Sequence, residues 1–262
     1  MIIRVDTLGN LITDTAYYLG KESQTLLHDI KGIDFQSDDP FGYRYIVENK
    51  KMQLSEVYLC HIARRLDTDN NMRLLTLIEL LTTTNSFSDF LRDHDISFDK
   101  SCQNGVELLY HGKVIDWREK RNIGYNPARF EMRLRKDFCV NGFQFLYDMV
   151  NSTQPNFNLY SCAPEFLQDL DLLLDAGLVN DFRSISHTFI ALCRLPIGKI
   201  VFDGNENDEN FEVRYIHSSL RFIWEYCFPK FKKGHNCILR GLDDYTVQVE
   251  KWIPEEKIEH FV

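Results

Sequence analysis

Apolar residues recur along the chain with two spacings, which predict a strand followed by helices. Residues 57–62 form a short run of apolar, β-branched and aromatic residues, which suits a buried strand better than a helix. Beyond them, apolar side chains recur three and four residues apart, as on helices that pack one face on a sheet: Met72, Leu75, Ile78, Leu80, Phe87, Phe90 and Leu91. The first part of the core is therefore predicted as a strand and then helices.

Turn residues mark the next elements. Residues 106–110 and 114–117 are strand-like and flank the tight turn His111-Gly112-Lys113, which predicts a hairpin. Pro164 opens an apolar periodic segment and Gly177 closes it, so a helix is predicted between them.

The last third of the chain is predicted mainly as sheet. A helix is expected over residues 218–228, and strands over 187–194, 199–202, 237–239 and 245–250. Residues 1–50 are polar and turn-rich and are predicted as an irregular N-terminal cap, and no linker or repeat divides residues 51–262. We therefore expect a single α+β domain with a split, mixed or antiparallel sheet core and flanking helices.

Composition narrows the class of protein. Of the 262 residues, 44% are hydrophobic and 13% aromatic, which provides enough apolar side-chain area for a large core. The net charge of −9 repels phosphate on average and argues against a general nucleic-acid coat protein. The start of the chain lacks a signal-peptide pattern, and no apolar run reaches the roughly 18 residues of a membrane span, so we expect a cytoplasmic protein with no membrane contact. The seven cysteines include no CxxC pair, which predicts reduced thiols and no zinc site.

Two charged segments each allow two interpretations. Seven cations between Arg118 and Lys136 form either a solvated surface or a site for an anion such as RNA. The acidic segment 203–210 resembles the start of a calcium-binding loop. Such a loop has glycine at the position of Asp208 and glutamate at the position of Arg214, so part of its ligand pattern is missing. A solvated turn is the simpler interpretation, and a surface that binds a basic partner is the other.

Motif searches exclude several enzyme classes and leave one resemblance. The chain has no GxxxxGK[ST], GxGxxG, HExxH or GxSxG. The early strand ends in Cys60-His61-Ile-Ala-Arg64-Arg65, and the last strand carries Gln248-Val-Glu250, followed by Ile253-Pro254 and Ile258. This layout resembles the ADP-ribosyltransferase superfamily, in which an early strand delivers His or Arg to NAD and a late strand carries the catalytic Glu.

The resemblance implies a site of three key residues, but it does not decide which residue fills the middle position between the early strand and the catalytic Glu. In the Arg-Ser-Glu branch of the superfamily, Ser184 and Ser186 would support the site, with Arg64 or Arg65 as the first element. In the His-Tyr-Glu branch, Tyr147 or Tyr160 would stack on nicotinamide, with His61 first. Tyr110-His111-Gly112 is a second match to the start of that branch, although a returning strand is predicted after it where the family has a helix.

The chemistry of such a site explains these residue types. Cleavage of the bond between nicotinamide and ribose builds positive charge on the sugar, which a carboxylate such as Glu250 would stabilise in the transition state. Gln248 would contact the acceptor, and His61, Arg64 or Arg65 would hydrogen-bond the ribose or pyrophosphate. The resemblance thus implies an enzyme that transfers ADP-ribose from NAD to a macromolecule, protein or nucleic acid, or to water. The alternative is a non-enzymatic binding protein of the immunity type that presents its acidic surface to a basic partner.

Overall fold

The chain folds into helices and β-sheets, as the sequence predicts. The computed structural model describes residues 1–33, 35, 40–69, 71–101, 105–119, 122, 124–136, 139–146, 162–204, 210–228, 237–242 and 246–258. Within them a seven-stranded sheet has the order β2-β10-β7-β1-β6-β9-β8, and a smaller sheet has the order β3-β4-β5. All strand pairs among these residues are antiparallel, so the antiparallel form of the predicted sheet is the one observed.

Two long strands form the centre of the large sheet. Strand β1 (Glu56–Leu66) pairs with β7 (Ser186–Pro196) along its whole length, with His61 opposite Ala191. Both strands are where the sequence predicts them. The shorter strands on either side are β2 (Arg73–Leu74), β6 (Asn141–Phe143), β8 (Ile200–Phe202), β9 (Ile238–Gly241) and β10 (Val247–Pro254).

Three helices replace the irregular cap expected for residues 1–50. They are α1 (Leu8–Tyr18), α2 (Ser23–Ile30) and α3 (Pro40–Asn49). The side chain of Thr7 caps α1 by accepting from the backbone N–H of Asn10. Apolar positions on these helices, such as Leu11, Leu26 and Ile46, are fully or almost fully buried. We call these three helices, with α11 (Phe211–Cys227), the helical lobe; α11 begins two turns before the predicted helix.

A second group of elements forms what we call the hairpin lobe. It contains the predicted hairpin and helices, with the following bounds: α4 (Leu77–Thr82), α5 (Ser86–Asp93), β3 (Ile96–Ser101), β4 (Gly105–Tyr110), β5 (Lys113–Val114), α6 (Pro127–Lys136), α9 (Glu165–Leu174) and α10 (Leu178–Ser184). Thr76 and Glu79 form a capping box that starts α4. Helix α9 begins just after Pro164, and its C-cap, Asp175, adopts a left-handed conformation close to the predicted stop at Gly177.

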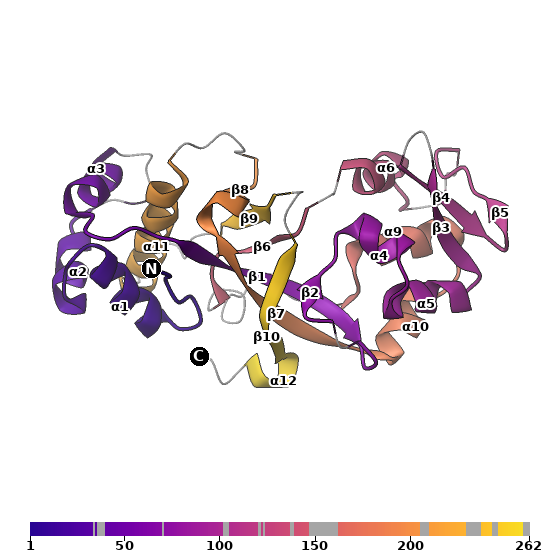
Figure 1. Ribbon diagram of the computed structural model, residues 1–262, viewed down its shortest axis with the longest axis horizontal. Helices are drawn as coiled ribbons and strands as arrows, with labels where there is room; N and C mark the ends of the chain where they lie inside the picture. The colour runs from indigo at the N-terminus through magenta and orange to yellow at the C-terminus, as the bar shows by residue number, and fades with distance from the viewer. Residues whose placement is uncertain are drawn as a thin grey trace.

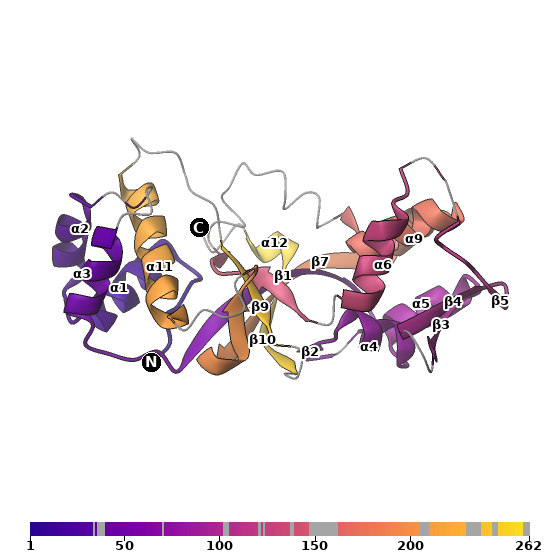
Figure 2. The ribbon, with the colours of Figure 1, turned by 90° about the horizontal axis from the view of Figure 1, so that it is seen from above.

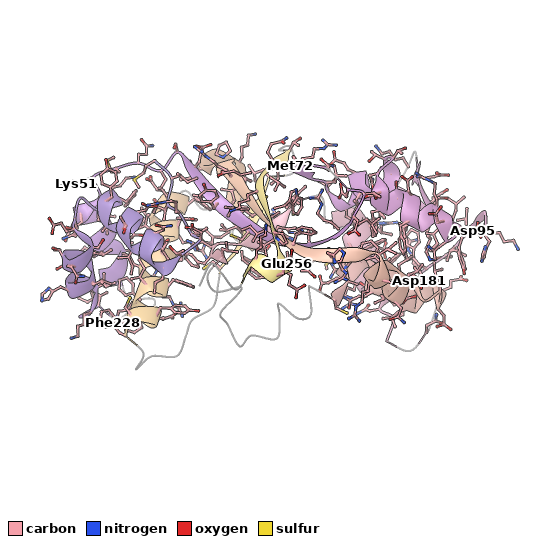
Figure 3. All side chains as sticks on the ribbon, turned by 90° about the horizontal axis from the view of Figure 1, so that it is seen from below. Lys51, Met72, Asp95, Asp181, Phe228 and Glu256 are labelled. Atoms are coloured by element: carbon pink, nitrogen blue, oxygen red, sulfur yellow. The ribbon has the colours of Figure 1, made fainter. Side chains whose placement is uncertain are left out.

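The two lobes lie at opposite ends of an elongated molecule, with the large sheet between them (Figure 1). Figure 2 shows β1 and β7 running from one lobe towards the other. Each lobe has its own cluster of buried apolar side chains, and the cluster of the helical lobe continues into the large sheet. In Figure 3, Lys51 and Phe228 mark the helical lobe, Asp95 and Asp181 the hairpin lobe, and Glu256 of α12 (Glu255–Ile258) the centre. No helix in the described part of the chain has the length and apolarity to cross a membrane.

Candidate functional site

A pocket of about 440 Å³ lies where the large sheet meets the hairpin lobe. Its volume is within the range of small-molecule sites. The wall on the sheet side carries polar groups, and the wall on the lobe side is mostly apolar. The residues used below are His61, Arg64, Arg65, Asn71, Arg73 and Asn141 on the first wall, and Leu77, Leu80, Phe87, Arg133, Glu165 and Phe166 on the second.

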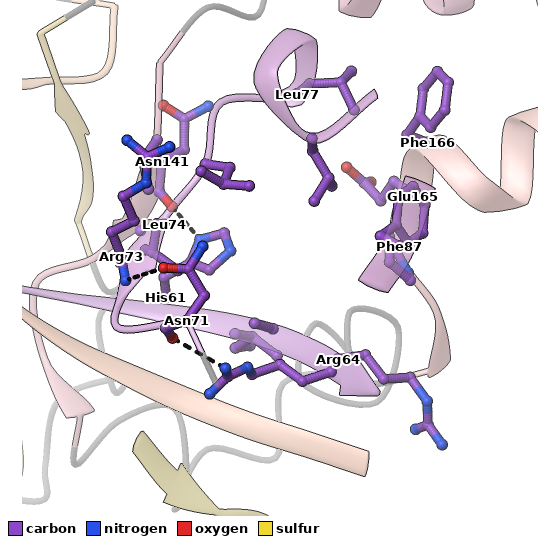
Figure 4. A pocket seen from close by; sticks show the side chains of 18 of the residues that line it. His61, Arg64, Asn71, Arg73, Leu74, Leu77, Phe87, Asn141, Glu165 and Phe166 are labelled. Atoms are coloured by element: carbon purple, nitrogen blue, oxygen red, sulfur yellow. Dashed lines mark hydrogen bonds between the residues drawn. The ribbon is translucent and has the colours of Figure 1, made fainter. Parts of the chain in front are cut away.

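His61 presents a hydrogen-bond acceptor to this pocket. Its Nδ1 lies 2.6 Å from the backbone oxygen of Asn141. Because a carbonyl oxygen only accepts, Nδ1 carries the proton, and in the neutral ring Nε2 keeps a free lone pair. Burial lowers the pKa of His61, against the opposite effect of the Asn141 carbonyl, which favours the neutral ring. Figure 4 shows the ring on the sheet side of the pocket.

Arg65 holds the loop that follows β1. Its guanidinium donates to the backbone oxygens of Asp69 and Asn71 at 2.8 and 3.0 Å and pairs with the Asp69 carboxylate. The indole N–H of Trp252 donates to the same Asn71 oxygen at 3.1 Å. Arg65 is only 9% exposed, so these bonds satisfy a buried cation and fix the path of the loop.

This loop places Arg73 and Asn71 in the pocket wall (Figure 4). The Asn71 side-chain oxygen accepts from the backbone N–H of Arg73 at 3.1 Å, which leaves the side-chain NH₂ group of Asn71 without a partner among the described residues. The Arg73 guanidinium is 40% exposed and lies 3.9 Å from Glu79, a loose ion pair. A cation and an amide donor therefore stand beside His61.

The wall of the hairpin lobe combines apolar groups with one carboxylate. Leu77 and Leu80 are only half-buried, although leucines of a closed core would be fully buried, and Phe87 and Phe166 lie beside them. Glu165 lies next to Phe87 and Phe166, across the pocket from His61 (Figure 4). Its Oε2 accepts from Arg133 at 2.6 Å.

The structure places Glu250 outside the pocket, against the prediction. Its Oε1 accepts from the Tyr58 hydroxyl at 3.3 Å, and its charge adds to that of Glu56 beside Arg194. Along a strand, side chains alternate between faces, so Tyr58 and His61 point to opposite faces of β1. Glu250 is thus on the other side of the sheet from His61. The predicted pairing of these two residues in one cavity is wrong.

The pairing register of β10 explains why Glu250 lies on this side of the sheet. The pairing of β10 with β7 shifts between Val249 and Lys251, a bulge at Glu250. Gln248 is opposite Arg73 in β2, is exposed, and also does not line the pocket. Neither residue of the predicted Gln-x-Glu pair therefore faces the described cavity.

Arg64 and Ser186 do come together. The Arg64 Nε donates to the Ser186 hydroxyl at 2.8 Å, and its terminal nitrogens bind Thr188 and the backbone oxygens of Arg183 and Ser186. Ser184 ends α10, and its hydroxyl donates to the backbone of Asp181, away from Arg64. Arg64 is six residues beyond Tyr58 along β1, about 20 Å at strand spacing, so Glu250 is not part of this cluster either.

Other predicted residues lie elsewhere. Tyr147 and Tyr160 lie outside the described residues, as does most of the acidic segment 203–210. His111 sits in the exposed turn of the β4–β5 hairpin and contacts Asp95, outside the pocket.

Much of the positive charge of the basic segment is paired. Arg118 and Arg135 bind Glu131, while Arg129 and Arg133 bind the fully buried Asp169. This favours a structural role over the anion site among these residues.

Sequence reasoning missed Asn71, Arg73 and Glu165. A weak signal existed for the first two, because they lie in the short polar segment that joins the early strand to the helices predicted after it. Nothing local marks Glu165, because Arg133, Phe87 and the pocket reach it only through the tertiary fold. Among the described residues no group of three or more His, Cys, Asp or Glu side chains could hold a metal ion.

Comparison with known proteins provides no further assignment. No family model matches the chain, and the searches of curated proteins and of solved structures found no match. The pocket geometry is therefore the basis for a functional proposal.

Proposed function

We propose that the protein binds a nucleotide in the pocket between the large sheet and the hairpin lobe, and that NAD is this nucleotide. The observation that carries the proposal is the Nε2 lone pair of His61, held towards the pocket by the bond from Nδ1 to Asn141. A neutral imidazole accepts from a hydroxyl and does not attract a phosphate, so His61 suits a ribose hydroxyl. Arg73 and the Asn71 amide beside it suit the pyrophosphate.

The apolar wall supports the same ligand class. Leu77, Leu80 and Phe87 offer partly exposed apolar surface that a planar ring can cover. Because about 440 Å³ suits one mononucleotide unit better than a complete dinucleotide, the second half of NAD would extend from the pocket. The NAD preference comes from the sequence resemblance, and the nucleotide class from the geometry.

Transfer of ADP-ribose to a macromolecule, the activity that the resemblance implies, stays a prediction. The position of Glu250 does not support it, because this carboxylate lies outside the cavity. Free nicotinamide released from NAD, with and without cell lysate as a source of acceptors, is the measurement for this activity.

Titration calorimetry with NAD tests the binding proposal. We expect binding by the wild type and a loss of about tenfold or more in affinity for His61→Ala and for Arg73→Ala, since each removes one polar contact in a partly desolvated site. His187→Ala is the matched control, because His187 is an exposed histidine of the same sheet and lies outside the pocket. No heat of binding with NAD, or equal affinity in all four proteins, would reject the proposal.

A further inference from the structure

The carboxylate of Glu165 has one oxygen in use and one available. Oε2 accepts from Arg133 at 2.6 Å, whereas Oε1 has no partner among the described residues. The Glu165 side chain is 35% exposed, and it lines the pocket. An available carboxylate oxygen beside apolar groups strongly favours a hydrogen-bond donor.

The surroundings of Glu165 suit an aromatic ring. Phe87 and Phe166 flank it, and Leu77 belongs to the same wall of the pocket (Figure 4). A ring that covers these side chains would bring its substituent to Oε1. His61 and Arg73 stand on the other wall, so the sugar and phosphates of the same ligand would lie towards the sheet.

Nearby charges disfavour an acidic substituent at this place. Arg133 pairs with Glu165, and it also binds the buried Asp169. Arg129 also binds Asp169. A third carboxylate beside Glu165 would therefore meet its negative charge, while the two described arginines that bind Glu165 or Asp169 are already paired.

From these contacts we infer that Glu165 determines which ring the pocket accepts, an inference that rests on the proposed binding of NAD. Oε1 accepts from the carboxamide NH₂ group of nicotinamide. The same oxygen rejects the carboxylate of nicotinic acid. Glu165 is thus a specificity-determining residue that neither the sequence pattern nor the resemblance indicates.

Two ligands that differ only in this group provide the test. Titration calorimetry compares NAD with nicotinic acid adenine dinucleotide on the wild type, Glu165→Gln and the control Glu107→Gln. Glu107 is an exposed residue of β4 outside the pocket. We expect the wild type and the control to bind NAD at least about tenfold more tightly than nicotinic acid adenine dinucleotide. The acid loses a hydrogen bond to the charged Glu165, and its carboxylate is repelled by it. In Glu165→Gln the ratio should fall to about threefold or less, since the amide can donate to the acid and carries no charge.

The outcomes separate this inference from the proposal beneath it. NAD binding with equal affinity for both dinucleotides, or an unchanged ratio in Glu165→Gln, overturns the role of Glu165 and leaves nucleotide binding in place. Absence of NAD binding overturns both. Thermal unfolding of Glu165→Gln, expected at nearly the wild-type temperature because Arg133 can still donate to the Gln oxygen, shows whether the variant is folded.

Discussion

The guanidinium carbon of Arg65 lies 3.9 Å from the centre of the Trp252 ring. Arg65 belongs to β1 and Trp252 to β10, so this cation–π contact reaches across β7, where Phe189 lies 5.9 Å from the same cation. Both residues also bind the backbone oxygen of Asn71. A buried cation thus connects two strands and the loop that forms the polar wall of the pocket.

Replacement of Arg65 by methionine should destabilise the fold. The change removes the ion pair with Asp69 and the bonds to two backbone oxygens, and we expect the free energy of unfolding to fall by about 2 kcal/mol, less than for a fully buried pair because Asp69 is 27% exposed. Urea denaturation measures the change. The control Arg92→Met removes an exposed ion pair with Asp89 and should cost at most about 1 kcal/mol. Equal losses in the two variants would contradict the structural role of Arg65.

His61 should make stability depend on pH in one direction. Burial lowers its pKa in the folded state below the unfolded value of about 6.5, so between the two values the unfolded chain binds more protons. The stability that the neutral His61 contributes to the fold is fully present above about pH 6.5, and it is lost as the pH falls towards the pKa of the folded state. Urea denaturation between about pH 5 and 8 should show a smaller decline on acidification in His61→Gln than in the wild type. His28→Gln, a change at an exposed histidine of α2, should decline like the wild type.

Glu250→Gln should leave NAD affinity unchanged. The carboxylate lies on the Tyr58 face of the sheet and does not line the pocket. Its exposure also predicts a change in the free energy of unfolding within about 0.5 kcal/mol. Calorimetry with NAD measures the affinity. A large loss of binding would mean that Glu250 reaches the ligand after all, and would restore the site that the sequence resemblance implies.

Gly142→Ala should be strongly destabilising. A Cβ atom at this position of β6 would lie 2.7 Å from the backbone oxygen of Cys60, which the pairing of β1 with β6 holds in place. We expect a loss of about 2 kcal/mol or more in the free energy of unfolding, and weaker NAD binding because neighbouring Asn141 orients His61. At Gly198 a Cβ atom would meet nothing within 4 Å, so Gly198→Ala is the control. Similar melting temperatures for the two variants would count against the close approach of β6 to β1.

The helices and strands that local patterns predict are largely the ones observed. Strand β1, the β4–β5 hairpin and helix α9 each carry their own signal, because apolar period, turn residues and caps act over a few neighbours. Helices α1–α3 escaped prediction because turn-forming residues such as Gly20, Gly32 and Pro40 interrupt the apolar pattern, although this segment is about as rich in hydrophobic residues as the whole chain. Their apolar faces become visible only against α11 and the sheet.

The sequence by itself determined that this protein is an α+β chain, and it identified His61 as a residue that the structure then places in a pocket wall. It left a mixed or an antiparallel sheet open, and the tertiary structure shows antiparallel pairing among the described strands. Only the tertiary structure decided which polar groups share that pocket. The face on which a strand residue lies depends on the register of pairing, and strands far apart in the sequence set this register. Here a bulge at Glu250, with β7 between β10 and β1, leaves Glu250 beside Tyr58. The fold instead brings Glu165, about a hundred residues from His61 along the chain, to the same cavity, because packing of the hairpin lobe against the sheet acts without regard to distance in sequence.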